Sequence, residues 1–336
     1  MRERVEEILR EEEAWVVGGA IRDELLGRPV VDLDVACRDP EAAARAYGGA
    51  PFPLSDRWGA WRVALDDGRT VDFTLLREGI EADLATRDFT VNAIAAPVGG
   101  GELVDPFGGR ADLESRTLRA VSPSIFEDDP LRLLRAARLE DELGFRLDPE
   151  TERLAREHAE LASRPAGERI LGELERLSTA GWRRLDELGL LSPLGGRVDD
   201  RLERADSPEL RLVAALGESL ERLPISNDLR RFARTLLAAA PPADGSARAI
   251  HRFRRATEPW ALEALNHLGA HEHAEAVRRS REHEPAEPLV RGDELGLPPG
   301  PAIGAILMEI EEERAAGTIS TREEALEHAR RRAGER

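Results

Sequence analysis

Residues 15–36 constrain the fold of this chain more than any other segment. They read WVVGGAIRDELLGRPVVDLDVA. The apolar run at residues 15–17 meets Gly18 and Gly19, and the pattern that follows predicts a helix that ends at Gly27. Beyond a proline turn, a second strand carries two acids. The sequence therefore predicts a strand, a glycine turn, a helix and a second strand in close succession.

The two acids of the second strand are Asp32 and Asp34. Side chains alternate along a strand, so both carboxylates lie on one face, about 7 Å apart along the chain. Paired carboxylates hold divalent cations, and glycines before a helix N-terminus hold phosphate. Alone, two aspartates on a strand are ordinarily part of a solvated face, and two glycines before a helix are ordinarily a tight turn. Together, with Arg22 and Asp23 on the helix, they indicate a site for a metal-bound triphosphate.

Two segments further along the chain carry polar residues that fit such a site. Two strand-like runs flank residues 66–68 (Asp-Asp-Gly), which predicts a hairpin. In its second run, Asp72 is either a third carboxylate of the metal site or an outward-facing strand residue. The segment Arg87-Asp88-Phe-Thr-Val-Asn92 predicts a helix on which Asp88 and Asn92, four apart, share a face. An ordinary helix face with an Arg-Asp pair is the alternative.

A later helix begins near Pro130 and carries Asp129 and Arg132, three residues apart. A carboxylate can accept from the exocyclic amine of a base, and a guanidinium can donate to a ring nitrogen or carbonyl. The pair can therefore imitate a template base, although plain N-capping also explains Asp129. Arg135 and Arg138 extend the same helix as either a basic rail toward phosphate or a solvated stripe.

These motifs resemble those of the DNA polymerase β nucleotidyltransferase superfamily, and specifically of the bacterial tRNA nucleotidyltransferase/poly(A) polymerase family. Residues 15–36 match its first motif. Residues 83–93 (DLATRDFTVNA) resemble its Arg-Arg-Asp-Phe-Thr-hydrophobic-Asn-Ala motif, with Thr86 in place of the first arginine. Residues 104–113 resemble its Asp-Pro-Phe-Gly-Gly connector. Its Glu-Asp-x-x-Arg motif appears with Asp128 where glutamate is usual.

The resemblance implies an α+β chain. A polymerase-β-like nucleotidyltransferase head, a small mixed sheet with helices, would occupy residues 1–118. Strand-like alternation ends near Leu118, and an all-α neck (119–200) with the nucleotide-selecting motif and an all-α, RNA-binding body and tail (201–336) would follow. Residues 168–174 resemble a family helix that buttresses the neck, so we expect a structural role for them.

The resemblance also implies the reaction: addition of C, A or both to the 3′ end of tRNA from CTP or ATP, with Mg²⁺. The implied catalytic and metal-binding residues are Asp32, Asp34 and Asp72. The implied nucleotide-binding residues are Gly18, Gly19, Arg22, Asp23, Arg87, Asp88, Asn92, Asp129, Arg132, Arg135 and Arg138. A loop of only a few residues separates the Asp72 strand from Asp83, which resembles CC-adding members. An A-adding or poly(A) enzyme, a small-molecule nucleotidyltransferase and a non-catalytic RNA-binding module are the alternatives.

Composition adds limits rather than a function. The formal net charge is −18, and all 48 basic residues are arginine. An acidic total argues mildly against a nucleic-acid partner, but arginine suits bidentate phosphate contacts. The single cysteine, Cys37, excludes an intramolecular disulfide. No apolar run approaches membrane-spanning length, and the cytoplasm is the expected location. His271, His273 and His283 fit a polar surface helix better than a metal site.

Overall fold

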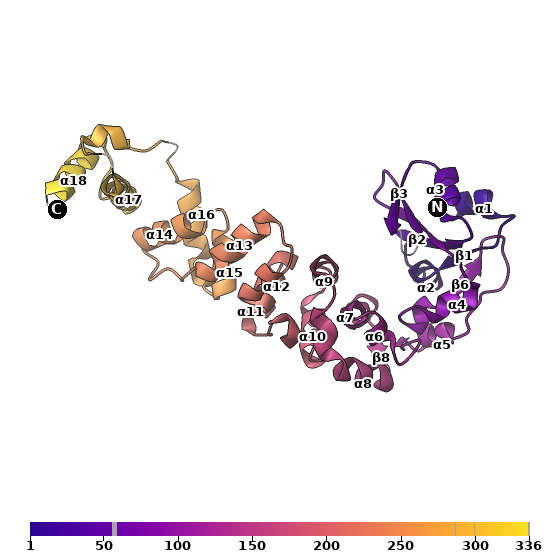
Figure 1. The fold of residues 1–336 in the computed structure, drawn as a ribbon. Helices are drawn as coiled ribbons and strands as arrows, with labels where there is room; N and C mark the ends of the chain where they lie inside the picture. Colours follow the sequence, from indigo (N-terminus) through magenta and orange to yellow (C-terminus); the bar gives the residue numbers. More distant parts are fainter. Residues whose placement is uncertain (56–58, 286, 299, 335–336) are drawn as a thin grey trace. The chain divides into compact units, whose positions relative to one another are not determined.

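The computed structural model describes residues 1–55, 59–285, 287–298 and 300–334 (Figure 1). They form two compact units, Met1–Leu194 and Gly195–Arg336. The division falls close to the boundary predicted after residue 200, whereas the predicted boundary at residue 118 lies inside the first unit and stays a prediction. No helix in the described ranges is both long and apolar enough to cross a membrane.

A six-stranded sheet forms the centre of the first unit, in the order β3-β4-β5-β2-β1-β6. β2 and β5 run parallel, and the other neighbouring strands run antiparallel. The hairpin predicted at residues 66–68 is confirmed, because it joins β4 to β5. The strands are β1 (Ala14–Val17), β2 (Asp32–Cys37), β3 (Ala50–Ser55), β4 (Ala60–Ala64), β5 (Thr70–Leu75) and β6 (Ala95–Pro97).

Helices cover this sheet and make up most of the rest of the first unit. They confirm the predicted α+β class with a long helical remainder. Those up to residue 128 are α1 (Arg2–Leu9), α2 (Gly19–Leu25), α3 (Pro40–Tyr47), α4 (Ile80–Ala85), the 3₁₀ helix η1 (Thr90–Asn92), α5 (Gly109–Glu114) and α6 (Ile125–Asp128). Those that follow are α7 (Leu131–Leu143), α8 (Pro149–Glu157), η2 (Ala159–Ser163), α9 (Gly167–Leu174), α10 (Thr179–Glu187) and η3 (Ser192–Leu194).

The sheet has one apolar face packed under α3 and one face that bears the acids. Val35 and Phe73 are fully buried under α3, and the guanidinium of Arg45 in α3 lies 5.5 Å from the centre of the Trp61 ring. Alternation sends their strand neighbours to the opposite face, which carries Asp34. At β1 and β2 that opposite face is covered by a separate apolar cluster that includes Leu84 of α4.

Two details of the first unit differ from the sequence prediction. The segment 88–92 is not a continuous α-helix: Phe89 is extended and bridges to Ala120, and only residues 90–92 form a 3₁₀ turn. Pairing of backbone groups with a distant segment overrides the local helical pattern here. In addition, β7 (Thr117–Leu118), at the end of the predicted head, pairs in parallel with β8 (Arg146–Leu147), which lies inside the neck that was expected to be all-α. Two-residue strands are too short to show alternation in a sequence.

The described part of the second unit is helical. Its last section has a small core of its own around Ile306, Ile310 and Ile319. The helices are α11 (Asp200–Arg204), α12 (Pro208–Leu216), η4 (Gly217–Arg222), α13 (Asn227–Ala238), α14 (Ala247–Thr257), α15 (Ala261–Leu268), η5 (His271–His273), α16 (Ala274–Glu282), η6 (Gly292–Leu295), α17 (Pro301–Ala315) and α18 (Arg322–Gly334).

Candidate active site

Gly18 turns the chain from β1 into α2, as predicted. Its φ of +75° is a conformation that residues with a side chain rarely adopt. A Cβ atom on Gly18 would lie 2.6 Å from Nη1 of Arg87 and 3.1 Å from Oδ2 of Asp34. The turn therefore requires glycine for its conformation and for space. It brings the start of α2 against one arginine and one carboxylate that the sequence assigned to the same site.

Asp32 and Asp34 lie on the same face of β2, as the alternation predicts. Asp32 accepts a hydrogen bond from Oγ1 of Thr70 at 2.7 Å. Within the described residues, Asp34 has no hydrogen-bond or ion-pair partner. Burial raises the pKa of Asp34, Arg87 opposes this, and repulsion from Asp72 and Asp32 adds to it. A half-buried carboxylate without a partner, beside two others, is what a divalent cation would neutralise, so this donor set fits a metal.

Asp72 lies beside Asp34 in the parallel register of β2 and β5. Its two oxygens accept from Nε and Nη2 of Arg62, both at 2.7 Å. This bidentate ion pair occupies the carboxylate that the sequence assigned to the metal. In the part of the chain that the structure describes, no three His, Cys, Asp or Glu side chains are arranged to hold a metal ion. The role of Asp72 as a metal ligand stays a prediction.

Asp88 and Asn92 meet although the helix predicted for them does not form. Nδ2 of Asn92 donates to Oδ1 of Asp88 at 2.9 Å, and the backbone N–H of Phe89 donates to the same oxygen at 2.8 Å. Arg135 forms an ion pair with the other oxygen at 2.9 Å. Burial opposes ionisation, but the charge of Arg135 and these hydrogen bonds lower the pKa of Asp88. Asp88 is therefore a buried, ionised anchor between two parts of the site.

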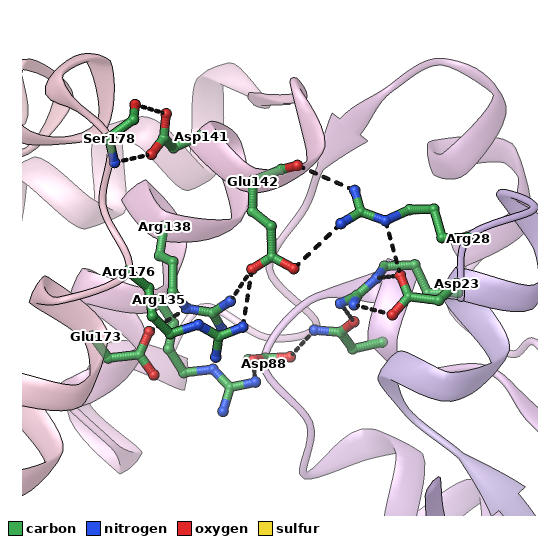
Figure 2. A network of polar contacts seen from close by, with 12 residues as sticks. Asp23, Arg28, Asp88, Arg135, Arg138, Asp141, Glu142, Glu173, Arg176 and Ser178 are labelled. Carbon is green, nitrogen blue, oxygen red and sulfur yellow. Dashed lines mark hydrogen bonds and ion pairs between the residues drawn. The ribbon is translucent and has the colours of Figure 1, made fainter. Parts of the chain in front are cut away.

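A chain of polar contacts continues from Asp88 across the site (Figure 2). Nη1 of Arg22 donates to Oδ1 of Asn92 at 2.8 Å, and the same guanidinium holds Asp23 at 2.9 Å. Arg28 follows α2 in the chain. Its Nε lies 3.7 Å from Oδ1 of Asp23, and its Nη2 lies 3.5 Å from Oε1 of Glu142 at the end of α7. The region of α2 and the end of α7 are thus connected through paired charges.

Asp129 and Arg132 lie at the start of α7 and line the same cavity. Asp129 accepts from the backbone N–H of Leu131 at 3.2 Å, which is the expected capping contact. Both of its oxygens also accept from Arg169 of α9, at 3.1 and 2.7 Å. Burial alone would raise the pKa of Asp129, but Arg169 brings it below its ordinary value. Nη2 of Arg132 donates to the carbonyl oxygen of Thr86 at 2.5 Å.

Arg135 and Arg138 are both paired with carboxylates. Arg138 is 6% exposed and pairs with Glu142 and with Glu173 of α9, both at 2.5 Å. Arg135 pairs with Asp88, while its Nε is buried without a partner. A solvated stripe therefore does not describe the buried Arg138, whereas the side chain of Arg135 is 37% exposed although it is paired. Both guanidinium groups line the cavity but are already paired with carboxylates. They are therefore not unpaired cations available to bind phosphate, as the alternative prediction of a basic rail required.

These residues surround one cavity of about 740 Å³ in the first unit. Most of the predicted site residues line it: Gly18, Gly19, Arg22, Asp23, Asp32, Asp34, Arg87, Asp88, Asn92, Asp129, Arg132, Arg135 and Arg138. Asp72 does not. Sequence reasoning missed Arg28, Glu142, Glu173 and Arg176, which also line it. The spacing of Arg138 and Glu142, four apart on a helix, was the available signal for one of them. Glu173 lies on the helix that was expected to be structural only.

Comparison with known proteins identifies relatives of this chain. Residues 62–119 match the family model described as the poly A polymerase head domain. An A-adding tRNA nucleotidyltransferase of Deinococcus radiodurans is 34% identical over 96% of each chain. A CC-adding tRNA nucleotidyltransferase of Geobacter sulfurreducens is 46% identical, over 49% of this chain and 40% of its own length.

Solved structures share the fold. A Thermotoga maritima CCA-adding enzyme complexed with tRNA is 24% identical, with a TM-score of 0.73 over 97% of this chain and 92% of its own. A CCA-adding enzyme complexed with ATP is 22% identical, with a TM-score of 0.77 over 99% of this chain and 94% of its own. At these identities the likeness concerns the fold alone.

Proposed function

We propose, from the premise that this chain belongs to the tRNA nucleotidyltransferase/poly(A) polymerase family, that it adds nucleotides to the 3′ end of tRNA without a template. The 3′-hydroxyl of the RNA would attack the α-phosphate of CTP or ATP and release pyrophosphate. The observation that carries the proposal is the position of Asp34, a half-buried carboxylate without a protein partner in the described residues, directly against the Gly18 turn. With tRNA as the substrate, we propose the cytoplasm as the location of the reaction.

Asp32 and Asp34 would hold the divalent cations of the reaction, for which we propose Mg²⁺. When bound, these ions lower the pKa of the attacking hydroxyl and neutralise charge on the phosphates. Asp32 is oriented for this by Thr70, and Asp34 by its half-buried position on β2. Asp72 would act indirectly. Its negative charge beside Asp34 would make cation binding there more favourable, and Arg62 holds the Asp72 carboxylate in place.

The triphosphate would lie over Gly18 and Gly19, which have no side chains of their own and are approached by the guanidinium groups of Arg87 and Arg22. The guanidinium of Arg87 is held above Gly18 by Asp83, at 3.0 Å, and is the nearest charge to that position. Arg22 would contribute a second positive charge from within α2. In-line transfer needs this fixed positive frame, since charge accumulates on the transferring phosphoryl group.

The base would be selected by Asp129 and Arg132. Because Arg169 keeps Asp129 ionised, its carboxylate is an acceptor and never a donor. It therefore favours bases with an exocyclic amine at the pairing edge, such as cytosine and adenine, over a keto group, as in uracil. Arg132 would donate to the ring nitrogen or carbonyl beside that amine. Arg169 donates one hydrogen bond to each oxygen of Asp129, which leaves further lone pairs on both oxygens to accept from a base.

We propose a CC-adding enzyme within the family. Only residues 76–79 connect β5 to α4, which leaves no room for a long flexible loop at that point. A short connection restricts the change in pocket shape that accepting a second kind of base would need. The competing candidate is an A-adding enzyme, favoured by the match to the Deinococcus radiodurans protein along 96% of both chains.

The deciding experiment uses the full chain and three tRNA transcripts that lack CCA, lack CA, or lack only A. Each is incubated with CTP, with ATP, and with both. We expect two C residues on the first transcript, one on the second, and no use of ATP. Addition of A to the third transcript alone would make this an A-adding enzyme, and complete CCA would refute the restriction to CC. No extension of any transcript would refute the proposed function. Asp34→Ala serves as the inactive control.

A further inference from the structure

One row of side chains crosses the sheet and extends beyond the cavity. Asp34 is in register with Asp72, Asp72 with Arg62, and Arg62 with Phe52 on the edge strand β3. Directly opposed residues on neighbouring strands share a face. The ion pair between Arg62 and Asp72 agrees with this, because it joins two side chains of the row. Phe52 therefore lies on the same face as the proposed metal-binding aspartates.

Phe52 is an unusual residue for an exposed position. It is 44% exposed, and its near neighbour Leu54 is 43% exposed. The helix α3 covers the opposite face of the sheet, where Trp61 lies, so it does not cover Phe52. Pro51 and Pro53 remove two backbone donors from this edge strand, which disfavours pairing with a further strand. What remains available for recognition is the side chains.

The chemistry of the site assigns this side of the sheet to the RNA. The cavity that would hold the nucleoside triphosphate includes Asp34 but not Asp72, Arg62 or Phe52. In phosphoryl transfer the attacking and leaving oxygens are roughly in line on opposite sides of phosphorus. Since pyrophosphate would leave on the side of Gly18, the RNA 3′-hydroxyl must approach from the side of β5, β4 and β3. The row from Asp34 to Phe52 follows that direction.

We propose that Phe52, next to Arg62, is a platform on which an unpaired base of the RNA 3′ end stacks, behind the nucleotide that reacts. Three strand spacings separate Asp34 from Phe52, or about 14 Å, which a few unpaired nucleotides can span. Every base has a π-face, so an aromatic platform binds RNA without reading its sequence, and a neighbouring guanidinium adds attraction. The inference rests on the proposed function and adds a specific contact for the RNA.

The test compares Phe52→Ala and Phe52→Trp with a control, Leu25→Ala. Leu25, on α2, is 46% exposed, so its truncation removes a similarly exposed apolar side chain from the same unit. The first readout is extension of tRNA that lacks CCA. We expect Phe52→Ala to raise KM for the RNA about tenfold, as the loss of one base stack does, with KM for CTP unchanged. Phe52→Trp and Leu25→Ala should retain the wild-type values.

The second readout does not depend on catalysis. tRNA transcripts carry 2-aminopurine in turn at each of their last three unpaired positions, and fluorescence reports stacking on the protein. Wild type and Phe52→Trp should quench at least one position, and Phe52→Ala should lose that quenching. Unchanged RNA KM and quenching in Phe52→Ala would overturn the platform, as would an equal effect of Leu25→Ala. If wild type extends no RNA, the proposed function fails; if wild type extends RNA and Phe52→Ala behaves identically, only the platform fails.

Discussion

Replacing Gly18 by alanine should impair nucleotide addition far more than it destabilises the fold. The substitution has two consequences that can be separated. The first is backbone strain, because φ is +75°, which costs about 1–3 kcal/mol for a residue with a side chain. The second is crowding: the new Cβ would lie 2.6 Å from Nη1 of Arg87, so that guanidinium must move.

The size of the catalytic loss follows from what Arg87 contributes. A hydrogen bond to a charged group contributes about 1.5–3 kcal/mol, which corresponds to about 10–150-fold in rate. Since Arg87 is also tied to Asp83, it cannot simply rotate back over the triphosphate. We expect kcat/KM for CTP to fall by about that factor in Gly18→Ala.

Gly27 offers a matched control. It also has a positive φ, of +67°, but a Cβ there would meet nothing within 4 Å. Gly27→Ala therefore reproduces the strain without the crowding. Denaturant unfolding should show comparable losses of stability for both variants, while a nucleotide incorporation assay should show a large loss only for Gly18→Ala. If both variants incorporate CMP equally well, the placement of Arg87 over Gly18 is not functional and the reasoning is refuted.

Three further outcomes follow from the paired charges. Arg138→Met should lower the free energy of unfolding by about 3–5 kcal/mol, because it leaves Glu173 buried without a partner, and adding Glu173→Gln should recover part of that loss in a double-mutant cycle. Asp34→Asn should abolish nucleotide addition, yet in EDTA it should unfold at the same or a higher temperature than wild type, because the amide avoids burying a charge; a clearly lower melting temperature would contradict this. The carbonyl of Leu154 and the carboxylate of Glu127 raise the pKa of His158, so its stabilising effect is complete below the unfolded pKa of about 6.5 and is lost as the pH rises through the higher folded value. His158→Gln should therefore lower the melting temperature more at pH 5.5 than at pH 9, and an equal effect at both would count against protonation.

The sequence predicts the parts of the site that depend on short spacing. Alternation places Asp32 and Asp34 on one face whatever the rest of the chain does. The contact of Asp88 with Asn92 was predicted correctly for the wrong reason, because a 3₁₀ turn also brings residues of this spacing together. The pairing of Arg62 with Asp72 was within reach: once the hairpin turn is placed at residues 66–68, its register sets these two residues opposite each other.

Partners that are distant in the sequence were beyond prediction. Arg169 reaches Asp129 across 40 positions, and Glu173 reaches Arg138 across 35. Nothing in the composition of α9 marks these two among its charged residues, since an exposed helix face has the same pattern. The two-residue strands β7 and β8 were missed because they are too short to be periodic. For Arg169 and Glu173, what the sequence lacks is the packing of α9 against α7.

The arginines of the cavity are already engaged before any substrate arrives. Arg22 holds Asp23, Arg87 holds Asp83, and Arg135 holds Asp88. An incoming anion must therefore compete with carboxylates for these cations, so that its binding is an exchange of partners. A chloride or a monophosphate is too small to replace several of these carboxylates at once, whereas the oxygens of a triphosphate are spread over three phosphates and can contact several of these arginines together. We therefore expect the resting pocket to discriminate against small anions.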